Sequence, residues 1–131
     1  MVDKKIEVKT IDQAISIVKS PIIIKIYMRF KEKYPKELIF KGNYATKKEI
    51  LDSIKERLIE TIQEDYLEVK SKISTIRKTG QDIILVDLEV LSVPLKIKVL
   101  ETQFTLTNLN KIFSILDSVR KRLESFTMPE D

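Results

Sequence analysis

One long stretch of helical periodicity constrains this chain more than any other feature. Between Thr46 and Glu64, apolar side chains recur every three or four residues, at Ile50, Leu51, Ile54, Leu58, Ile59 and Ile62. Thr46 and Glu49 have the spacing of a capping box, so we expect a helix to begin there. On a helical wheel the apolar positions cover an arc of roughly 180°, whereas contact with one sheet face requires only about 100°. We therefore expect this helix to contact a sheet on one side and a further apolar surface on its flank.

The segment before this helix begins with a short extended stretch, which we place at residues 1–9. Thr10 and Gln13 form a second capping box, and the apolar residues after them predict a first helix at 11–19. Pro21 should end that helix, because the residue before a proline is displaced from the helical region.

Alternating apolar residues from 22 to 30 then predict a strand with one fully apolar face. The segment at 33–36 supplies a turn, and 38–41 is interpreted as the antiparallel return strand. After the long helix, the pattern predicts a three-stranded meander whose strands and turns lie at 67–77, 78–81, 82–91, 92–94 and 95–100.

A last helix is predicted after Thr107, which we expect to be its N-cap. Its apolar residues again recur at three and four, at Leu109, Ile112, Phe113, Leu116, Val119 and Leu123. The tail at 127–131 should be frayed. A chain of 131 residues fits one domain, so we expect a single α+β domain over 1–131 with the order helix, strand, strand, helix, three strands, helix. We place four residues in the core against the sheet: Ile54, Leu58, Ile112 and Leu116.

Composition excludes many kinds of catalytic and metal site. The sequence has no cysteine, histidine or tryptophan, which excludes disulfides, zinc fingers, thiol nucleophiles and imidazole bases. No defensible catalytic, cofactor-binding or metal motif remains, so we expect a protein that is not an enzyme and holds no cofactor. The abundance of Ile, Lys and Glu is typical of thermophile proteins, archaeal ones included, although an AT-rich genome produces the same bias. No apolar run reaches the length of a membrane span and no signal peptide is evident, so we expect a cytoplasmic protein.

One alternative is a magnesium-dependent nuclease. Acidic and basic residues cluster on the predicted meander, at Asp82, Asp87, Glu89, Lys96, Lys98 and Glu101. Such sites place Glu and Lys two residues apart on one strand, whereas Leu91 follows Glu89 at that distance. The spacing therefore favours alternating polar residues on a solvated strand face.

A second alternative is nucleic-acid binding, since the formal net charge is +4 and the pI is about 9.2. Lysine-rich segments at 31–36 and 70–78 could follow a phosphate backbone, with Tyr34 as a stacking group. However, Lys and Arg are locally balanced by Asp and Glu, as in Lys55, Glu56 and Arg57. We therefore expect only weak binding at physiological salt.

The element order, the apolar long helix and the ending 98–100 followed by 109–123 resemble the roadblock/dynein-light-chain family, which is similar to longin and profilin-like folds. The resemblance spans about 11–126. It implies a five-stranded antiparallel sheet with helices on both faces, and a homodimer that pairs through the long helix and the following strand. It also implies a non-enzymatic regulatory or scaffold role in which the dimer docks a small Ras-like GTPase or another protein subunit.

The resemblance and the wide apolar arc together place a dimer interface at Leu51, Ile59, Ile62, Tyr66, Leu67, Val69 and Ile73. Arg57 or Arg77 could act as an arginine finger toward a GTPase, but the sequence favours ordinary surface arginines.

Overall fold

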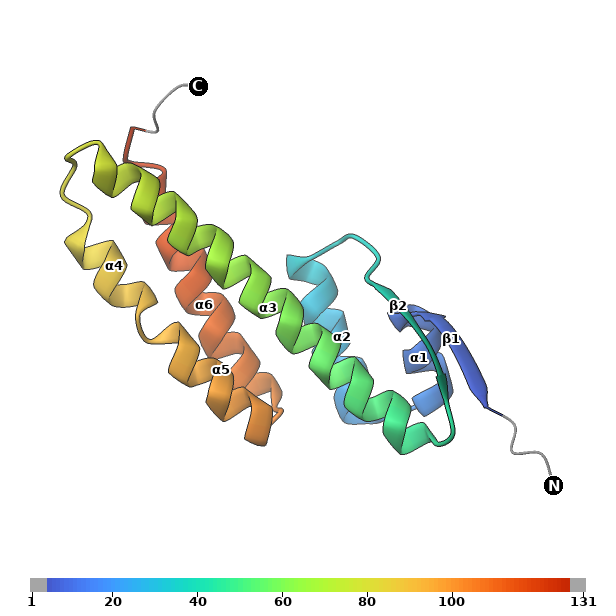
Figure 1. Cartoon of the computed structure of the whole chain (residues 1–131). Coiled ribbons are helices and arrows are strands. Elements are labelled where there is room, and N and C mark those ends of the chain that lie inside the picture. The colour runs from blue at the N-terminus through green and yellow to red at the C-terminus, as the bar shows by residue number, and fades with distance from the viewer. Residues whose placement is uncertain (1–4, 128–131) are drawn as a thin grey trace. The chain divides into compact units, whose positions relative to one another are not determined.

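The computed structural model describes residues 5–127 and is mostly helical (Figure 1). Its elements in chain order are β1 (Ile6–Thr10), α1 (Ile11–Val18), α2 (Pro21–Lys33), β2 (Ile39–Tyr44), α3 (Lys47–Lys78), α4 (Ile84–Val90), α5 (Val93–Thr102) and α6 (Leu106–Leu123). The chain divides into two compact units, with the boundary inside α3. Unit 1 holds the described residues up to Leu58, and unit 2 those from Ile59 onward. The single-domain prediction is not tested by this division and stays a prediction.

The predicted five-stranded sheet with helices on both faces is wrong, because the described residues form a two-stranded sheet. β1 pairs with β2 in antiparallel register, with Ile6 opposite Tyr44 and Val8 opposite Gly42. The predicted return strand at 38–41 therefore overlaps β2, but its partner is the extended N-terminal segment. β2 does not pair with 22–30, since that segment is helical.

The first predicted helix is confirmed as α1. Thr10 Oγ1 accepts a hydrogen bond from the Gln13 amide, and Gln13 in turn accepts one from the Lys9 amide. Lys19 ends the helix in the left-handed conformation, with φ of 55°. These contacts satisfy backbone groups that the helix ends would otherwise leave unpaired.

The strand predicted at 22–30 is helix α2 in the structure. Pro21 occupies the first turn, where its missing amide costs nothing, and Ser20 accepts a hydrogen bond from the Ile23 amide. The buried residues have helical spacing: Ile23, Ile26, Tyr27 and Phe30. The alternation of apolar residues that predicted a strand was misleading, because this helix also carries apolar residues on its solvent side, at Ile22, Ile24 and Met28.

A polar contact links α1 to α2 in unit 1. Asp12 accepts hydrogen bonds from Tyr27 Oη at 3.0 Å and from Lys31 Nζ at 3.3 Å. The Lys31 ammonium also lies 5.5 Å from the centre of the Tyr27 ring. Burial of Tyr27, followed by its hydrogen bond to Asp12, raises the pKa of its phenol above the ordinary value of 10.0.

The long helix is confirmed, and it extends beyond its predicted end as α3. Thr46 Oγ1 accepts a hydrogen bond from the Glu49 amide, as in a capping box, and the Glu49 side chain accepts one from the amide of Ala45, the residue before the N-cap. The strand predicted at 67–77 is wrong, since those residues continue α3. Gly80, with φ of 85°, lies in the turn that follows.

Unit 2 is a bundle in which α4 and α5 follow one another along α6 (Figure 1). The strands predicted at 82–91 and 95–100 are therefore wrong, and the turn predicted at 92–94 is the break between two helices. α6 confirms the last predicted helix, although its N-cap is Thr105 and not Thr107. Burial of the four predicted core residues is confirmed, with exposures of 0% at Ile54, Leu58, Ile112 and Leu116.

At the C-terminal end, Thr127 and Gln81 exchange two hydrogen bonds of 3.0 and 2.7 Å. The rest of the predicted frayed tail, at 128–131, lies outside the described residues. Among the helices that the structure describes, none is both long and apolar enough to cross a membrane.

The helical phase of α2 predicts unequal effects of two neighbouring truncations. Ile26 is buried and Met28 is 64% exposed, whereas a strand would place both on one face. Ile26→Ala should lower the free energy of unfolding by about 2–5 kcal/mol, and Met28→Ala should change it by less than about 0.5 kcal/mol. Urea denaturation measures both. Equal losses of unfolding free energy in the two variants would contradict the assignment of this segment to a helix.

The Tyr27 phenol predicts a loss of stability in alkali. Its pKa is raised in the folded state, so above about pH 10 the unfolded chain releases this proton more readily than the folded chain does. The free energy of unfolding should therefore fall as pH rises through 10. Urea denaturation at pH 8 to 11 measures how steeply the free energy of unfolding falls with pH, and Tyr27→Phe should make this fall less steep. An equally steep fall in the variant would show that Tyr27 is not its source.

Candidate functional site

The segment formed by α4 and α5 is apolar on two opposite sides. One side, which we call the inner face, is buried and has a regular three-and-four spacing: Ile83, Val86, Val90, Val93, Ile97 and Leu100. α4 and α5 both contact α6. This spacing is that of a helix packed on helices, and it accounts for the core of unit 2 on this side.

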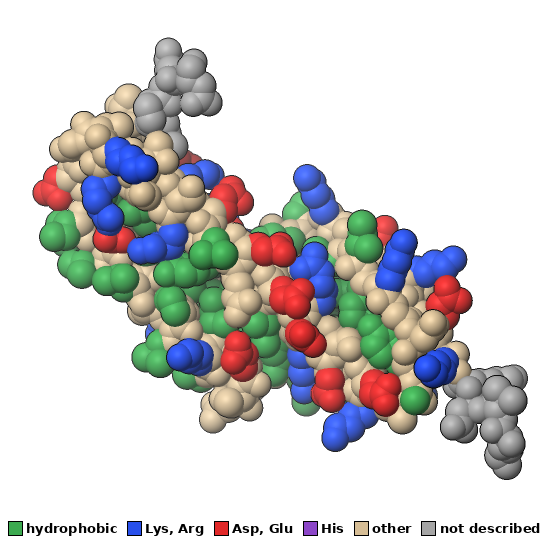
Figure 2. Space-filling view, in the orientation of Figure 1, with side chains coloured by type: hydrophobic (Ala, Val, Ile, Leu, Met, Phe, Trp, Pro, Cys, Tyr) green, Lys and Arg blue, Asp and Glu red, His purple; other side chains and the backbone are tan. Residues whose placement is uncertain are grey.

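The opposite side is apolar and open to solvent. This outer apolar face consists of Ile84, Leu85, Leu88, Leu91, Leu95 and Val99. The first five are between 54 and 71% exposed, and Val99 is 42% exposed. In Figure 2 hydrophobic side chains gather over α4, at the left edge of the view. Single exposed leucines are common on proteins, but a contiguous group of six is not.

The break between α4 and α5 preserves the alignment of these residues. Leu91 and Ser92 both have right-handed helical backbone angles, so the rotation per residue continues nearly unchanged. Pro94 causes the break, because it has no amide to donate to the carbonyl of Val90. At 100° per residue the outer apolar face spans about 120°, directly opposite the inner face. Between residues 83 and 100, all of which are described, no charged residue falls inside that arc.

Charged side chains on the two flanks tie α4 to its neighbours. Asp87 pairs with Lys70 Nζ at 3.4 Å and with Arg77, both from α3. Glu89, which lies 200° further round, has its Oε2 3.1 Å from Nη1 of Arg122 on α6. These ion pairs hold α4 from two opposite flanks. They therefore fix the rotation of α4 about its axis and keep the outer apolar face toward solvent.

A buried ion pair joins the other two helices of unit 2. The Asp65 side chain on α3 is only 4% exposed and pairs with Arg120 on α6. A buried carboxylate without a counter-ion is costly, so this pair sets the alignment of α3 against α6. It belongs to the scaffold that presents the outer apolar face.

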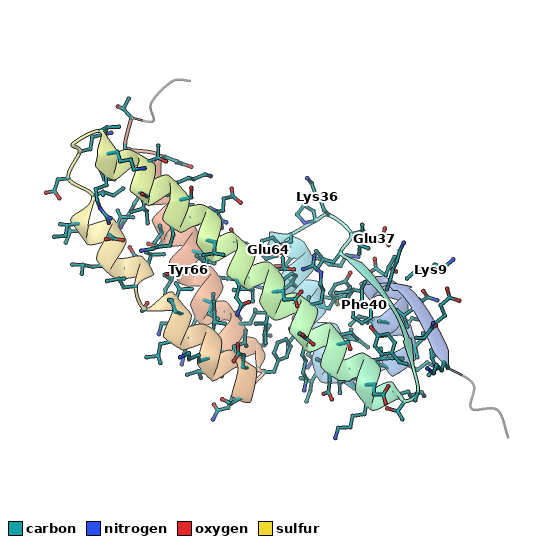
Figure 3. The ribbon with its side chains drawn as sticks, in the orientation of Figure 1. Lys9, Lys36, Glu37, Phe40, Glu64 and Tyr66 are labelled. Atoms are coloured by element: carbon teal, nitrogen blue, oxygen red, sulfur yellow. The ribbon has the colours of Figure 1, made fainter. Side chains whose placement is uncertain are left out.

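A shallow groove of 370 Å³ lies between α3 and α5 within unit 2. Its lining is Gln63, Tyr66, Leu67, Pro94, Ile97, Lys98 and Glu101. Tyr66, labelled in Figure 3, contributes a half-buried ring, and Leu67 beside it is 63% exposed. The groove thus adds apolar surface next to α5, on the flank that carries Lys98.

The residues predicted as a dimer interface are separated by the structure into buried and accessible ones. Ile59, Ile62, Val69 and Ile73 are buried. Tyr66 and Leu51 are half-buried and Leu67 is exposed, with Leu51 in unit 1 and the others in unit 2. Their role as an interface is untested and stays a prediction.

The acidic residues of the nuclease alternative do not converge. Asp87 and Glu89 lie on a helix and bond to opposite neighbours, and Asp82 accepts a hydrogen bond from the Ile84 amide at the start of α4. Among the described residues no group of three acidic side chains is arranged to hold a metal ion. The geometry therefore offers no shared site for the carboxylates on which that alternative depended.

Several of the basic residues singled out in the sequence have acidic or backbone partners. Lys70 pairs with Asp87, and Lys72 pairs with Glu68 at 3.4 Å. Arg57, one of the two candidate arginine fingers, donates to the carbonyl of Ile39 at 3.4 Å, and the other, Arg77, pairs with Asp87. These contacts give both arginines a structural role within their own units.

Sequence reasoning missed the outer apolar face, although a signal for it was present. The inner positions between 83 and 100 follow a strict three-and-four spacing, which a strand does not require. Once that spacing assigns a helix, the remaining apolar residues must lie on its far side.

Comparisons with known proteins give the chain no family. No protein-family model matches it, and neither a curated protein nor a solved structure is found to be similar. The roadblock resemblance depended on an element order that the structure does not have, and it stays a prediction without a match in its favour. The function must therefore be argued from the outer apolar face itself.

Proposed function

We propose that this protein is a non-enzymatic interaction module that binds another protein chain through the outer apolar face of unit 2. One observation carries the proposal. On a chain with 34% charged residues, the solvent side of α4 and α5 presents six large aliphatic residues and no charge over its whole length. Exposure of such a surface to water is unfavourable, and large exposed patches mark interaction sites.

The shape of the face favours a helical partner. A straight stripe of aliphatic residues at helical spacing offers ridges and grooves into which another helix can pack. The groove beside α5 widens the available surface. A regulatory or scaffold role, as expected from the sequence, is consistent with such a surface, whereas catalysis would need converging polar groups.

A lipid surface is a poorer fit for the same residues. Helices that lie in a membrane interface combine a basic polar face with aromatic anchors. The outer apolar face has no aromatic residue, and its flanks carry two acids, Asp87 and Glu89, beside two lysines, Lys96 and Lys98. Flanks with balanced charge lack the basic excess that anionic lipid attracts, so a protein partner is favoured.

Site-specific photo-crosslinking tests the proposal. A photoreactive amino acid at Ser92, which is exposed within the outer apolar face, should form protein adducts in the source cells. The same probe at Ser114, an exposed position on α6, is the matched control and should form few. Adducts at Ser92 should disappear when Leu88→Lys and Leu95→Lys are added, because two buried ammonium groups would oppose association. Equal adducts at both positions, or none at Ser92, would refute the proposal.

A further inference from the structure

We propose that the occupant of the outer apolar face is the same face of a second copy of this chain, with the two α4–α5 segments antiparallel about a twofold axis close to Ser92. This inference rests on the proposed function and specifies the partner. Three features of the face support it: its apolar pattern, the order of its flanking charges and its area.

The apolar pattern is nearly symmetric about its own centre. Under an antiparallel twofold arrangement, residues whose numbers are equally distant from the axis face each other. Ile84 then faces Val99 of the second copy, Leu88 faces Leu95, and Leu91 lies beside the axis. Ile84, Leu88, Leu95 and Val99 each meet an aliphatic side chain of similar size and Leu91 lies beside its own copy, so most of the face is complementary to itself.

The flanking charges have the order that an antiparallel pair requires. On the two flanks of the outer apolar face, acids occupy the first half of the segment and lysines the second half. In the register set by the apolar pairs, Asp87 lies two residues from the position that faces Lys98 of the second copy, and on the other flank Glu89 lies two residues from the position that faces Lys96. That offset is about 3 Å, which a flexible lysine side chain can span. Asp87 and Glu89 already pair with α3 and α6, and their side chains remain 23% and 24% exposed. A parallel twofold pair would instead place Asp87 beside Glu89 of the second copy, which is repulsive.

The area of the face is close to what a dimer needs. Six aliphatic residues with these exposures present on the order of 600 Å² of apolar surface, the upper end for a typical monomer. A specific interface buries about 800 Å² on each partner. The outer apolar face thus supplies about three quarters of that area, and its polar flanks add to it.

The mass of the protein in solution tests this inference. Sedimentation across a wide concentration range should give a monomer of 15.3 kDa on dilution and twice that mass when concentrated. Leu88→Lys with Leu95→Lys should remain monomeric while keeping its helical circular dichroism. Ile22→Lys with Met28→Lys is the matched control, because those residues are equally exposed apolar positions on α2, and it should still dimerise. A wild-type chain that stays monomeric at the highest concentration would overturn the inference.

The direction of the pairing has its own test, because the chain has no native cysteine. With a short bismaleimide, Ser92→Cys should crosslink two copies, since this position lies near the axis. Thr102→Cys should not, since its two copies would lie at opposite ends of the interface. Crosslinking at both positions would indicate a parallel pair and contradict the proposed arrangement.

The charge pairs are tested by reversal of the lysines. Lys96→Glu with Lys98→Glu should raise the dissociation constant of the dimer about tenfold, because acids would then face acids. An unchanged constant would contradict the flank pairing.

The outcomes separate this inference from the proposed function. Adducts at Ser92 with the mass of two chains support both. Adducts only with a different protein would leave the proposed function standing and refute the homodimer. Binding to anionic vesicles that Leu88→Lys with Leu95→Lys abolishes, without any protein adduct, would overturn both.

Discussion

The rotation of α4 about its own axis is the constraint on which the functional surface depends. Asp87 is bound by cations of α3 and Glu89 lies against Arg122 of α6, so the two flanks of the helix are held from opposite directions. The inner face then fills the core, with Val90 and Val93 fully buried. Because a helix has a fixed angular spacing, this anchoring also decides which residues point away from the core.

The residues that point away give the segment a second apolar side. A surface helix normally has one apolar stripe and a polar opposite side, while a helix that is apolar all round is normally buried. The α4–α5 segment lies between these two kinds, because it has two opposite apolar sides separated by charged flanks, and only one of those sides is covered within unit 2. An association that covers the outer apolar face would account for this arrangement. Because the face is nearly symmetric, we propose a second copy of the chain as the partner.

The parts of the fold that the sequence predicted correctly are helices with a single apolar stripe. α1, the start of α3 and α6 are of this kind, and the burial of Leu58 and Leu116 followed from their spacing. The errors fall on α2 and on α4 and α5, where apolar residues occupy both sides of a helix. In these segments apolar and polar residues also alternate along the sequence. Over so few residues, the alternation of a strand cannot be distinguished from two apolar stripes on opposite sides of a helix. The extension of α3 past Glu64 was missed because its buried residues, such as Val69 and Ile73, also alternate with polar neighbours.

The candidate site could not be predicted for the same reason. A strand interpretation places half of the residues between 83 and 100 on each side of a sheet, so none is left uncovered. Only the helical phase assigns Ile84, Leu88 and Leu95 to one exposed stripe. The charge pairs that anchor α4 join residues up to 33 positions apart, between Glu89 and Arg122, and no local pattern encodes them.

A thiol-accessibility scan tests the central claim most directly, since the chain has no native cysteine to interfere. Single cysteines would be placed at each position from 83 to 100 and their reaction rates with a water-soluble reagent measured in dilute protein. The account predicts fast reaction at 84, 88, 91 and 95 and slow reaction at 86, 90, 93 and 97, with protection of the fast positions as the protein is concentrated. Rates that alternate with every second residue, or fast positions that stay equally reactive at high concentration, would contradict it.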